Sequence, residues 1–452
     1  MAAAFGLSGG GGLPGAERLM EQYYGHAKVI ALESSWLIER ASESVGKRGR
    51  RHAGEERRDL GGGFVRVGDK IALANSNVFV GDRAALMRVF DLAHQEGVEM
   101  DAKTQALVRE QLHLIDDGFR TDPKVNEIFV GMLKRPAGVS GVLGQMNELG
   151  VLGRYIPEFG EVVCRVQHDA YHVYTVDVHT LFAIEKFGEL GVNAQAPSLL
   201  RRLYSGLKEK HLVNLALLLH DIGKGTGKDH DLRGAEMAGT IAARMGLSDE
   251  DGYRVRLLVE NHLLMSLLAF KRDIHEAKVL SDFAKQIADE KSLKLLYLLT
   301  YADINAVAPD LWNDWKAKLL EDLYTDTFAL LEKGERTGEG AEERLEKNRS
   351  GALRLLEGEA PAREIGGFFE AMGDRFAGSL DSDTIARCYR AYRRLRDDVL
   401  RLDVSPEPMG GLTHVIVCTP DVSGLYSMIA GVFAANRVNI VDSEIYTSRD
   451  AV

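Results

Sequence analysis

Basic charge and long apolar runs are scarce in this sequence of 452 residues. Lysine and arginine number 56 against 67 aspartate and glutamate, so the net charge is −11 and the chain lacks the positive field that nucleic-acid-binding proteins usually carry. No apolar run approaches the roughly 18 residues of a membrane-spanning helix, and Met1 to Glu17 has neither the basic start nor the apolar stretch of a secretion signal. We therefore expect a cytoplasmic protein that binds neither nucleic acid nor a membrane.

Cysteine and aromatic residues are also sparse. The three cysteines, Cys164, Cys388 and Cys418, form no Cys-x-x-Cys pair, which excludes a disulfide framework and a thiolate zinc site and fits a reducing compartment. Aromatic residues make up 7% of the chain, whereas 45% is hydrophobic and 27% charged, as in ordinary helical globular proteins. At about 150 residues per domain, the length allows roughly three domains.

Apolar spacing predicts helices along most of the chain. A long amphipathic helix is expected from Arg18 to Ala41, and helical periodicity resumes at Ala84 and continues to about Leu402. Between them, residues 64–80 alternate apolar and polar side chains, which favours a small β-hairpin or an irregular insert. The predicted fold class is therefore mainly α.

The pattern changes after the proline- and glycine-rich residues 406–411. Residues 414–419 predict a strand, residues 424–436 a helix and residues 438–447 a second strand, which is the β-α-β beginning of an α+β domain. Upstream, Asp381 and its polar neighbours are expected to cap a helix over residues 384–400.

The most informative segment is HLVNLALLLHDIGKGTG, His211 to Gly227. Its helix is apolar on every side and is therefore expected to be buried all round. The helix ends at His220-Asp221, where the negative end of the helix dipole favours a bound cation. The pair is predicted to bind a metal, and a purely structural helix end is the alternative.

Further metal ligands are expected from two other helices. His179 precedes the apolar Phe182 by three residues, and Asp303 follows Leu299 by four, so each polar residue shares a face with apolar neighbours and points inward. Buried polar groups cost free energy without a partner such as a metal. A hydrogen-bonded polar core residue is the alternative reading of each.

Other candidates lie around this set. His230 and His262 are further candidates at expected helix ends, and the alternative is that they are ordinary surface or capping histidines. Lys224 is a candidate to hold a phosphoryl oxygen, or an exposed turn lysine, and Arg272 is a candidate for the same cleft or a surface ion pair. The second His-Asp pair, His168-Asp169, has no buried helix before it and no Gly-Lys turn after it, so we expect no metal there.

The order His179, His220-Asp221, Asp303 resembles the HD superfamily of metal-dependent phosphohydrolases. Further segments resemble the bifunctional uridylyltransferase/uridylyl-removing enzymes, which modify the nitrogen-regulatory protein PII. The resemblance runs in order over most of residues 15–452. The segments that carry it are GVLGRYIPE (150–158), DAYHVYTVDVHT (169–180), LLLHDIGKG (217–225), NHLLMS (261–266), KRDI (271–274), YADI (301–304) and LWNDWK (311–316).

The resemblance implies the domain layout. Residues 1–165 would form a helical connector region with the β insert near 64–80, and residues 166–335 the HD phosphohydrolase domain. Residues 336–410 would be a helical linker, and residues 411–452 a truncated ACT domain.

The resemblance also implies the chemistry. The HD domain would hydrolyse the phosphodiester between UMP and a PII tyrosine. It would use a divalent cation, Mg²⁺ or Mn²⁺, as one ion or two. Its ligands would be His179, His220, Asp221 and Asp303, with His230 and His262 at a second ion. Asp221 and Lys224 would act in catalysis, and Lys224 and Arg272 would bind the substrate phosphate. Val178 stands where the family often has Glu. This argues against a residue that supports the metal ligands at position 178, but it does not affect the ligands themselves.

Two parts of the family pattern are incomplete. Before residue 165 we find no Gly-Ser or Gly-Gly turn followed by Asp-x-Asp, the nucleotidyltransferase motif, so transferase activity is not expected from these residues. The segment around Asp421, Gly424 and Leu425 resembles the strand-to-helix turn with which an ACT domain binds glutamine. Only β-α-β of the βαββαβ fold is present, which makes glutamine control by this chain doubtful.

Two other functions fit the same residues. An HD phosphohydrolase could act on a nucleotide, (p)ppGpp or a cyclic dinucleotide, but generic HD enzymes lack the flanking segments quoted above. Alternatively, the chain could be a non-catalytic PII-binding regulatory fragment, for which loss of metal ligands would be the sign, and none is missing.

Overall fold

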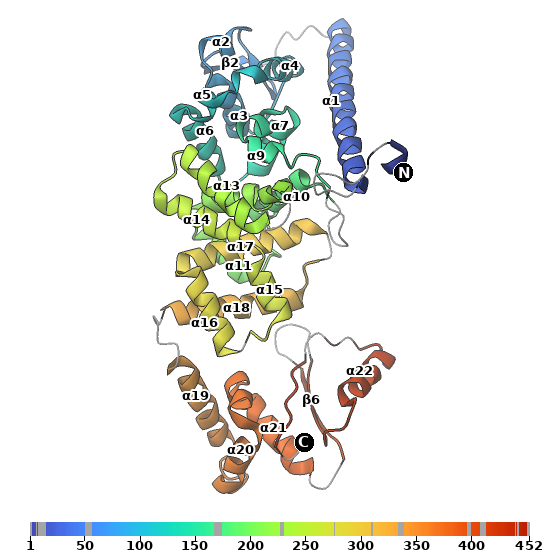
Figure 1. The fold of residues 1–452 in the computed structure, drawn as a ribbon, viewed down its shortest axis with the longest axis vertical. Helices are drawn as coiled ribbons and strands as arrows, with labels where there is room; N and C mark the ends of the chain where they lie inside the picture. The colour runs from blue at the N-terminus through green and yellow to red at the C-terminus, as the bar shows by residue number, and fades with distance from the viewer. Residues whose placement is uncertain are drawn as a thin grey trace. The chain divides into compact units, whose positions relative to one another are not determined.

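A computed structural model describes residues 2–5, 7, 15–49, 57–166, 174–226, 230–274, 276–308, 311–332, 339–395, 399–406, 413–438, 440 and 443–449. Helices dominate it and the strands form two small sheets, which confirms the mainly α class (Figure 1). The chain divides into two compact units, residues 1–272 with 287–324, and residues 273–286 with 325–452. None of the helices among the described residues is long and apolar enough to cross a membrane.

The first unit begins with a short helix, η1 (Ala2–Phe5), the long α1 (Gly15–Gly49) and a four-stranded sheet. The strands are β1 (Arg57–Gly61), β2 (Phe64–Val67), β3 (Lys70–Leu73) and β4 (Glu99–Met100). β2 pairs antiparallel with β1 and β3, and β4 adds parallel to β3. Gly68 lies at φ 60°, which a glycine adopts without strain, so the chain turns tightly from β2 into β3.

Short helices pack against this sheet and lead to the centre of the unit. Their core contains large rings with no exposed surface, including Phe64, Phe90 and Phe129. The elements are α2 (Val78–Gly81), α3 (Ala85–Glu96), α4 (Ala102–Glu110), η2 (Leu112–Leu114), α5 (Asp117–Arg120), α6 (Pro123–Leu133), α7 (Val139–Glu148), α8 (Val151–Tyr155) and α9 (Pro157–Gly160).

A second group of helices in the first unit surrounds α12 (Lys210–Leu219). Every residue of α12 from Leu212 to Leu219 is buried, as the apolar pattern predicts. It packs against α10 (Val176–Glu189), α14 (Asp249–Glu260) and α17 (Glu290–Val307). The remaining elements along this stretch of the chain are α11 (Ser198–Ser205), η3 (Ile222–Thr226), α13 (His230–Arg244), α15 (Leu264–Lys271), α16 (Ala277–Ile287) and α18 (Asp314–Glu332). Of these, α16 up to residue 286 and α18 from residue 325 belong to the second unit.

The second unit has its own core, formed by α19 (Glu339–Leu355), α20 (Ala362–Ser379) and α21 (Ser382–Arg394). Phe368 lies at its centre, with its ring against those of Phe376 and Tyr389. The carboxylate of Asp381 accepts hydrogen bonds from the backbone N–H groups of residues 383 and 384, so it caps α21 as predicted. The helix ends at Arg394, earlier than the predicted residue 400.

The C-terminal segment differs from the predicted β-α-β order. β5 (Arg401–Pro406) pairs antiparallel with β6 (Thr413–Cys418), and α22 (Leu425–Ala435) follows. The predictions of helix to residue 402 and of a helical linker to residue 410 are therefore wrong at β5. Its side chains alternate in exposure and its backbone pairs with β6, as in a strand. No strand is assigned among the described residues after 437, and residues 439, 441 and 442 of the strand predicted over 438–447 lie outside the described part.

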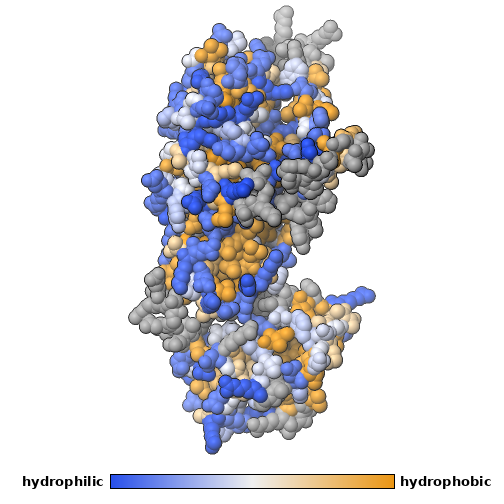
Figure 2. Space-filling model, viewed as in Figure 1, coloured by the Kyte–Doolittle hydropathy of each residue, from blue (hydrophilic) through white to orange (hydrophobic). Residues whose placement is uncertain are grey.

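α22 carries no charged residue and none of its residues is buried. Tyr426, Met428 and Val432 are each about half exposed or more. Apolar surface gathers over this helix in Figure 2.

Candidate metal centre

The end of α12 places His220 and Asp221 in the interior. His220 follows the last helical residue, and the side chains of His220 and Asp221 are 1% and 4% exposed. The imidazole Nε2 of His220 lies 3.2 Å from Oδ2 of Asp221. The two polar side chains predicted from the sequence thus lie side by side in a buried place.

His179 of α10 and Asp303 of α17 meet this pair. Nε2 of His179 lies 3.2 Å from Nε2 of His220 and 3.0 Å from Oδ1 of Asp303. Oδ1 of Asp303 is 3.6 Å from Nε2 of His220. Three residues from three different helices therefore present their ligand atoms within 4.8 Å of one another.

His262 stands on the other side of His220. It lies two residues beyond α14, its ring centroid is 5.3 Å from that of His220, and its Nε2 is 3.9 Å from Oδ1 of Asp221. Asp221 lies between His179 and His262, since its Oδ2 is 3.9 Å from Nε2 of His179. Its two oxygens thus face different histidines.

The backbone sets which nitrogen of two neutral imidazoles carries the proton. Nδ1 of His220 lies 2.7 Å from the carbonyl oxygen of Leu217, and Nδ1 of His262 lies 2.7 Å from that of Val259. A carbonyl only accepts, so each Nδ1 donates and each Nε2 of the neutral ring offers a lone pair to the cluster. This hydrogen bond from the second ring nitrogen is the arrangement typical of metal-binding histidines.

The carboxylates set the electrostatics of the cluster. Burial opposes the charged form of His220, but Asp221 beside it outweighs burial and raises the pKa of His220 to about 9. Burial likewise opposes ionisation of the acids, yet His220 and Lys224 hold the pKa of Asp221 well below its usual range. For Asp303, burial is again outweighed, by the hydrogen bond from His179, and its pKa is lowered. Burial and the nearby His220 lower the pKa of His262.

The donor set suits a divalent transition-metal ion or Mg²⁺ held partly through water. Donor atoms that share one ion at about 2.1 Å lie about 3.0–3.4 Å apart, close to the 3.0 and 3.2 Å separations around Nε2 of His179. Imidazoles favour Mn²⁺, Fe²⁺ and Zn²⁺, and carboxylates also accept Mg²⁺. His179, His220 and Asp303 would hold such an ion, with Asp221 and His262 beside it.

The other predicted site residues are placed as follows. Nζ of Lys224 lies 2.7 Å from Oδ2 of Asp221, and its side chain is 13% exposed, so it is part of the same cluster. Arg272 follows the last residue of α15 and its side chain is exposed, whereas the cluster residues are buried. His230 begins α13, but its side chain lies outside the described part, as does the whole pair His168-Asp169.

The predicted effector turn lies in the second unit. Gly424 precedes α22 at φ 78°, a conformation that favours glycine. Asp421 is exposed and Leu425 half-buried. Nothing buried converges on this turn among the described residues, so its role in binding glutamine stays a prediction.

Two family models match the chain where these features lie. Residues 64–155 match "Uridylyltransferase GlnD third domain", and residues 178–303 match "HD domain", a range that includes His179 and Asp303. The curated relatives are named bifunctional uridylyltransferase/uridylyl-removing enzyme. That of Cereibacter sphaeroides is 34% identical over 455 residues, covering 100% of this chain and 49% of the relative. The chain belongs to this family.

Other members show similar figures. The Pseudomonas putida enzyme is 35% identical, and the match covers 96% of this chain and 49% of that enzyme. The Rhodospirillum rubrum enzyme is 36% identical, and the match covers 86% of this chain and 42% of that enzyme. The chain thus spans about half the length of these relatives. Among solved structures, a CCA-adding enzyme with ATP aligns at a TM-score of 0.39 and 11% identity over 73% of this chain and 64% of its own, too distant to support any conclusion.

Just before the HD match of this family member, one buried carboxylate anchors α10, the helix that carries His179. Asp177, two residues before His179, accepts hydrogen bonds from the backbone N–H of Cys164 at 3.0 Å and from Nδ2 of Asn147 at 2.9 Å. Nζ of Lys28 on α1 lies 3.7 Å away and donates to Oδ1 of Asn147. The first turn of α10 is therefore tied to α7 and α1. Sequence analysis missed this role, because the partners are distant along the chain.

A second supporting group fixes the start of α17, the helix that carries Asp303. Asp289 caps α17 by accepting from the backbone N–H of Ser292 at 2.8 Å. Arg254 of α14 donates to both oxygens of Asp289 and to the hydroxyl of Ser292. The Asp-x-x-Ser spacing is a capping signal that the sequence contains.

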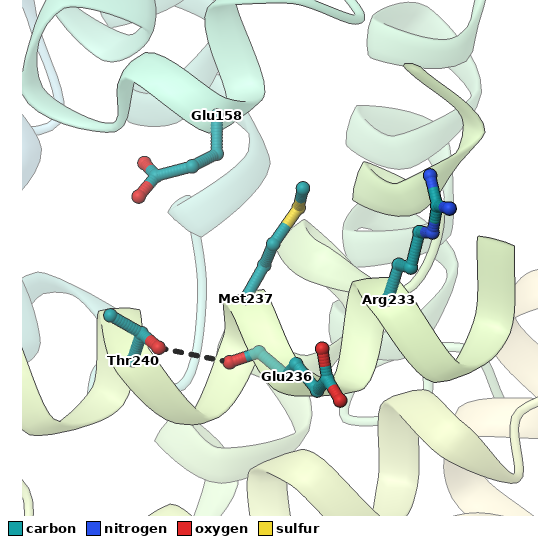
Figure 3. A pocket seen from close by; sticks show the side chains of 5 residues that line it. All are labelled: Glu158, Arg233, Glu236, Met237 and Thr240. Carbon is teal, nitrogen blue, oxygen red and sulfur yellow. Dashed lines mark hydrogen bonds between the residues drawn. The ribbon is translucent and has the colours of Figure 1, made fainter. Parts of the chain in front are cut away.

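A pocket of about 410 Å³ lies elsewhere in this unit, between α9 and α13. Glu158, Arg233, Glu236, Met237 and Thr240 line it (Figure 3). Figure 3 shows Met237 pointing toward the α9 side, and Thr240 donates to the backbone carbonyl of Glu236. Its mixed charges do not converge on one point, so the histidine cluster is the better functional site.

Proposed function

We propose that this chain is a metal-dependent phosphodiesterase that releases UMP from uridylylated tyrosine of a PII-type nitrogen-regulatory protein. The observation that carries the proposal is the buried cluster of His179, His220 and Asp303, with Asp221 and His262 beside it. Membership of the uridylyl-removing family supports the choice of substrate. The proposed catalytic domain is residues 166–335, and Mn²⁺ or Mg²⁺, as one or two ions, is the proposed cofactor.

When bound, the cation would activate water and offset charge on the phosphoryl oxygens. The protein's own contribution is orientation: the Nε2 atoms of His220 and His262 face the cluster because their Nδ1 atoms are held by carbonyls. Asp221 supplies an oxygen toward each side. The tyrosine that leaves has an unperturbed pKa of about 10, so its departure needs little help from a general acid.

Lys224 is the proposed phosphate-binding side chain. Its ammonium is paired with Asp221 and retains some exposure, so it brings positive charge to the edge of the metal cluster. A phosphoryl oxygen could take one of its three donors without breaking that pair. Arg272, exposed at the end of α15, is the weaker candidate for the same role.

The test is the release of UMP from uridylylated PII by the purified chain with added Mn²⁺. The His220→Ala variant removes a cluster ligand. His211→Ala is its matched control, because His211 lies on the same helix, nine residues earlier, outside the cluster. Tryptophan fluorescence checks that each variant is folded, and metal analysis checks loading.

We expect UMP from the unsubstituted chain and from His211→Ala, and none from His220→Ala. A folded, metal-loaded chain that releases no UMP would contradict the proposal. If it still hydrolysed bis(p-nitrophenyl) phosphate, the metal site would be catalytic with another substrate, such as a nucleotide. If it hydrolysed nothing and bound PII, the non-catalytic reading would replace it. Incorporation of uridylyl groups from UTP would contradict our further expectation that this chain lacks transferase activity.

A further inference from the structure

One face of α1 is apolar and open. The opposite face, which includes Lys28, Leu32 and Trp36, is half-buried, and Lys28 and Glu33 bind the rest of the unit through Asn147 and Arg109. Figure 1 shows α1 as a long helix beside α4 and α7. On the outer face, Tyr23 is 61%, Ile30 65% and Leu37 58% exposed.

The outer face has the spacing of a helix-pairing seam. Its residues follow one another at alternating steps of four and three, the 3.5-residue period at which two helices pack along their length. Large and small side chains alternate along the seam. Its members are Tyr23, Ala27, Ile30, Ser34, Leu37 and Ala41.

This alternation is complementary to itself in one orientation. If a second α1 runs antiparallel about a two-fold axis at residue 32, Tyr23 faces Ala41, Ala27 faces Leu37 and Ile30 faces Ser34. Every large side chain then meets a small one, as knobs-into-holes packing requires. A two-fold interface needs such a self-complementary surface, whereas an unrelated partner does not.

Charge does not oppose this pairing. Between Tyr23 and Ile38 the only charged residues are Lys28 and Glu33, and both are engaged with their own chain. Like charges that meet across the seam of two identical helices would oppose their association. The helix from Tyr23 to Ile38, about 22 Å long, therefore presents no like charges to its copy.

The area is sufficient for a specific dimer. From ordinary residue areas, the exposed parts of the seam and of the adjoining Ile38 amount to roughly 600 Å² per helix, so a pair would bury about 1,200 Å², the lower end of the range for stable interfaces. Ile38 is 67% exposed. We propose that two copies of this chain associate through α1, antiparallel, with the seam residues 23–41 as the interface. The proposal is independent of the enzymatic one.

The first test is the molecular mass of the 452-residue chain in solution, measured by sedimentation over a concentration series. We expect a dimer, and Ile30→Glu should weaken it at least about 100-fold because a charge would be buried opposite Ser34. Val29→Glu is the matched control. Val29 is 55% exposed but points away from the seam, so its dissociation constant should change less than about threefold.

A monomer at all concentrations, with α1 helical by circular dichroism, would overturn the proposal. So would a dimer that Ile30→Glu leaves intact, since the interface would then lie elsewhere. Both positions are exposed, so neither substitution threatens the fold.

The second test addresses direction. Under mild oxidation, Tyr23→Cys mixed with Ala41→Cys should form a disulfide-linked dimer, whereas Tyr23→Cys alone should not. Efficient linking of Tyr23→Cys to itself would show a parallel pair and refute the register. The unsubstituted chain is the control for Cys164, Cys388 and Cys418, none of which forms a disulfide.

Discussion

Replacement of Asp177 by alanine should damage both the stability of the first unit and its metal site. The carboxylate is buried and accepts two hydrogen bonds, from the Cys164 backbone and from the Asn147 amide. Both donors would be left buried without an acceptor in the variant. Because Asp177 lies in the first turn of α10, the same loss would loosen His179.

The magnitude follows from the number of bonds lost. Hydrogen bonds to a charged group are worth about 1.5–3 kcal/mol each, so two of them amount to about 3–6 kcal/mol. The ion pair with Lys28 adds little, since the lysine side chain is 25% exposed. Asp177→Asn keeps an acceptor for the Cys164 N–H, but its new amide N–H groups would face the amide N–H groups of Asn147. We expect it to lower the free energy of unfolding by about 1–2 kcal/mol.

The assay is urea unfolding followed by tryptophan fluorescence. All three tryptophans, Trp36, Trp312 and Trp315, lie in the first unit, so the signal reports that unit alone. Mn²⁺ titration by calorimetry gives the second readout, for which we expect a loss of about 10–100-fold, typical of partners behind metal ligands. A free energy of unfolding within 1 kcal/mol of the unsubstituted chain, with unchanged metal affinity, would refute the reasoning.

Three further predictions concern the cluster and its supports. His220→Ala and Asp303→Asn should each reduce Mn²⁺ affinity at least about 100-fold by calorimetry, and unchanged affinity would exclude them as ligands. Without metal, the raised pKa of His220, about 9, stabilises the fold below its unfolded value of 6.5, and this contribution should disappear as the pH rises through 9. Mn²⁺ affinity should rise over the same range because metal displaces the proton, and urea and Mn²⁺ titrations at several pH values check both trends, which a flat profile would contradict. Asp289→Ala should destabilise the first unit by about 1–2 kcal/mol through loss of the α17 cap, whereas Ser292→Thr, which keeps a hydroxyl, should cost less; equal unfolding midpoints would argue against the cap.

The cluster residues could be predicted because helical spacing fixes their direction. His179 and Asp303 each share a helix face with apolar residues, and an apolar face must turn inward. The turn after Asp221 ends a helix that is buried all round, so its last side chains could only be internal. The structure brings these residues together. From the sequence alone, only their common burial could be predicted, not their contact.

Other features depend on tertiary contacts that spacing does not reveal. The hydrogen bond from Asn147 to Asp177 joins residues on two helices, and nothing in either local sequence indicates the partner. β5 follows closely after α21, and no glycine or proline stands between residues 395 and 405 to mark the end of the helical pattern. The strand predicted over residues 438–447 lies partly outside the described residues, and those of its residues that are described pair with no neighbouring strand.

The position of His220 and His262 just beyond helix ends has a kinetic consequence. The last carbonyls of a helix have no partner within it, and here those of Leu217 and Val259 receive the imidazole N–H groups instead. The rings are therefore aimed by the backbone before any ion arrives. Unlike a zinc finger, which folds around its metal, this protein should exchange its cation without refolding. After chelation, recovery should then proceed at a rate proportional to the metal concentration.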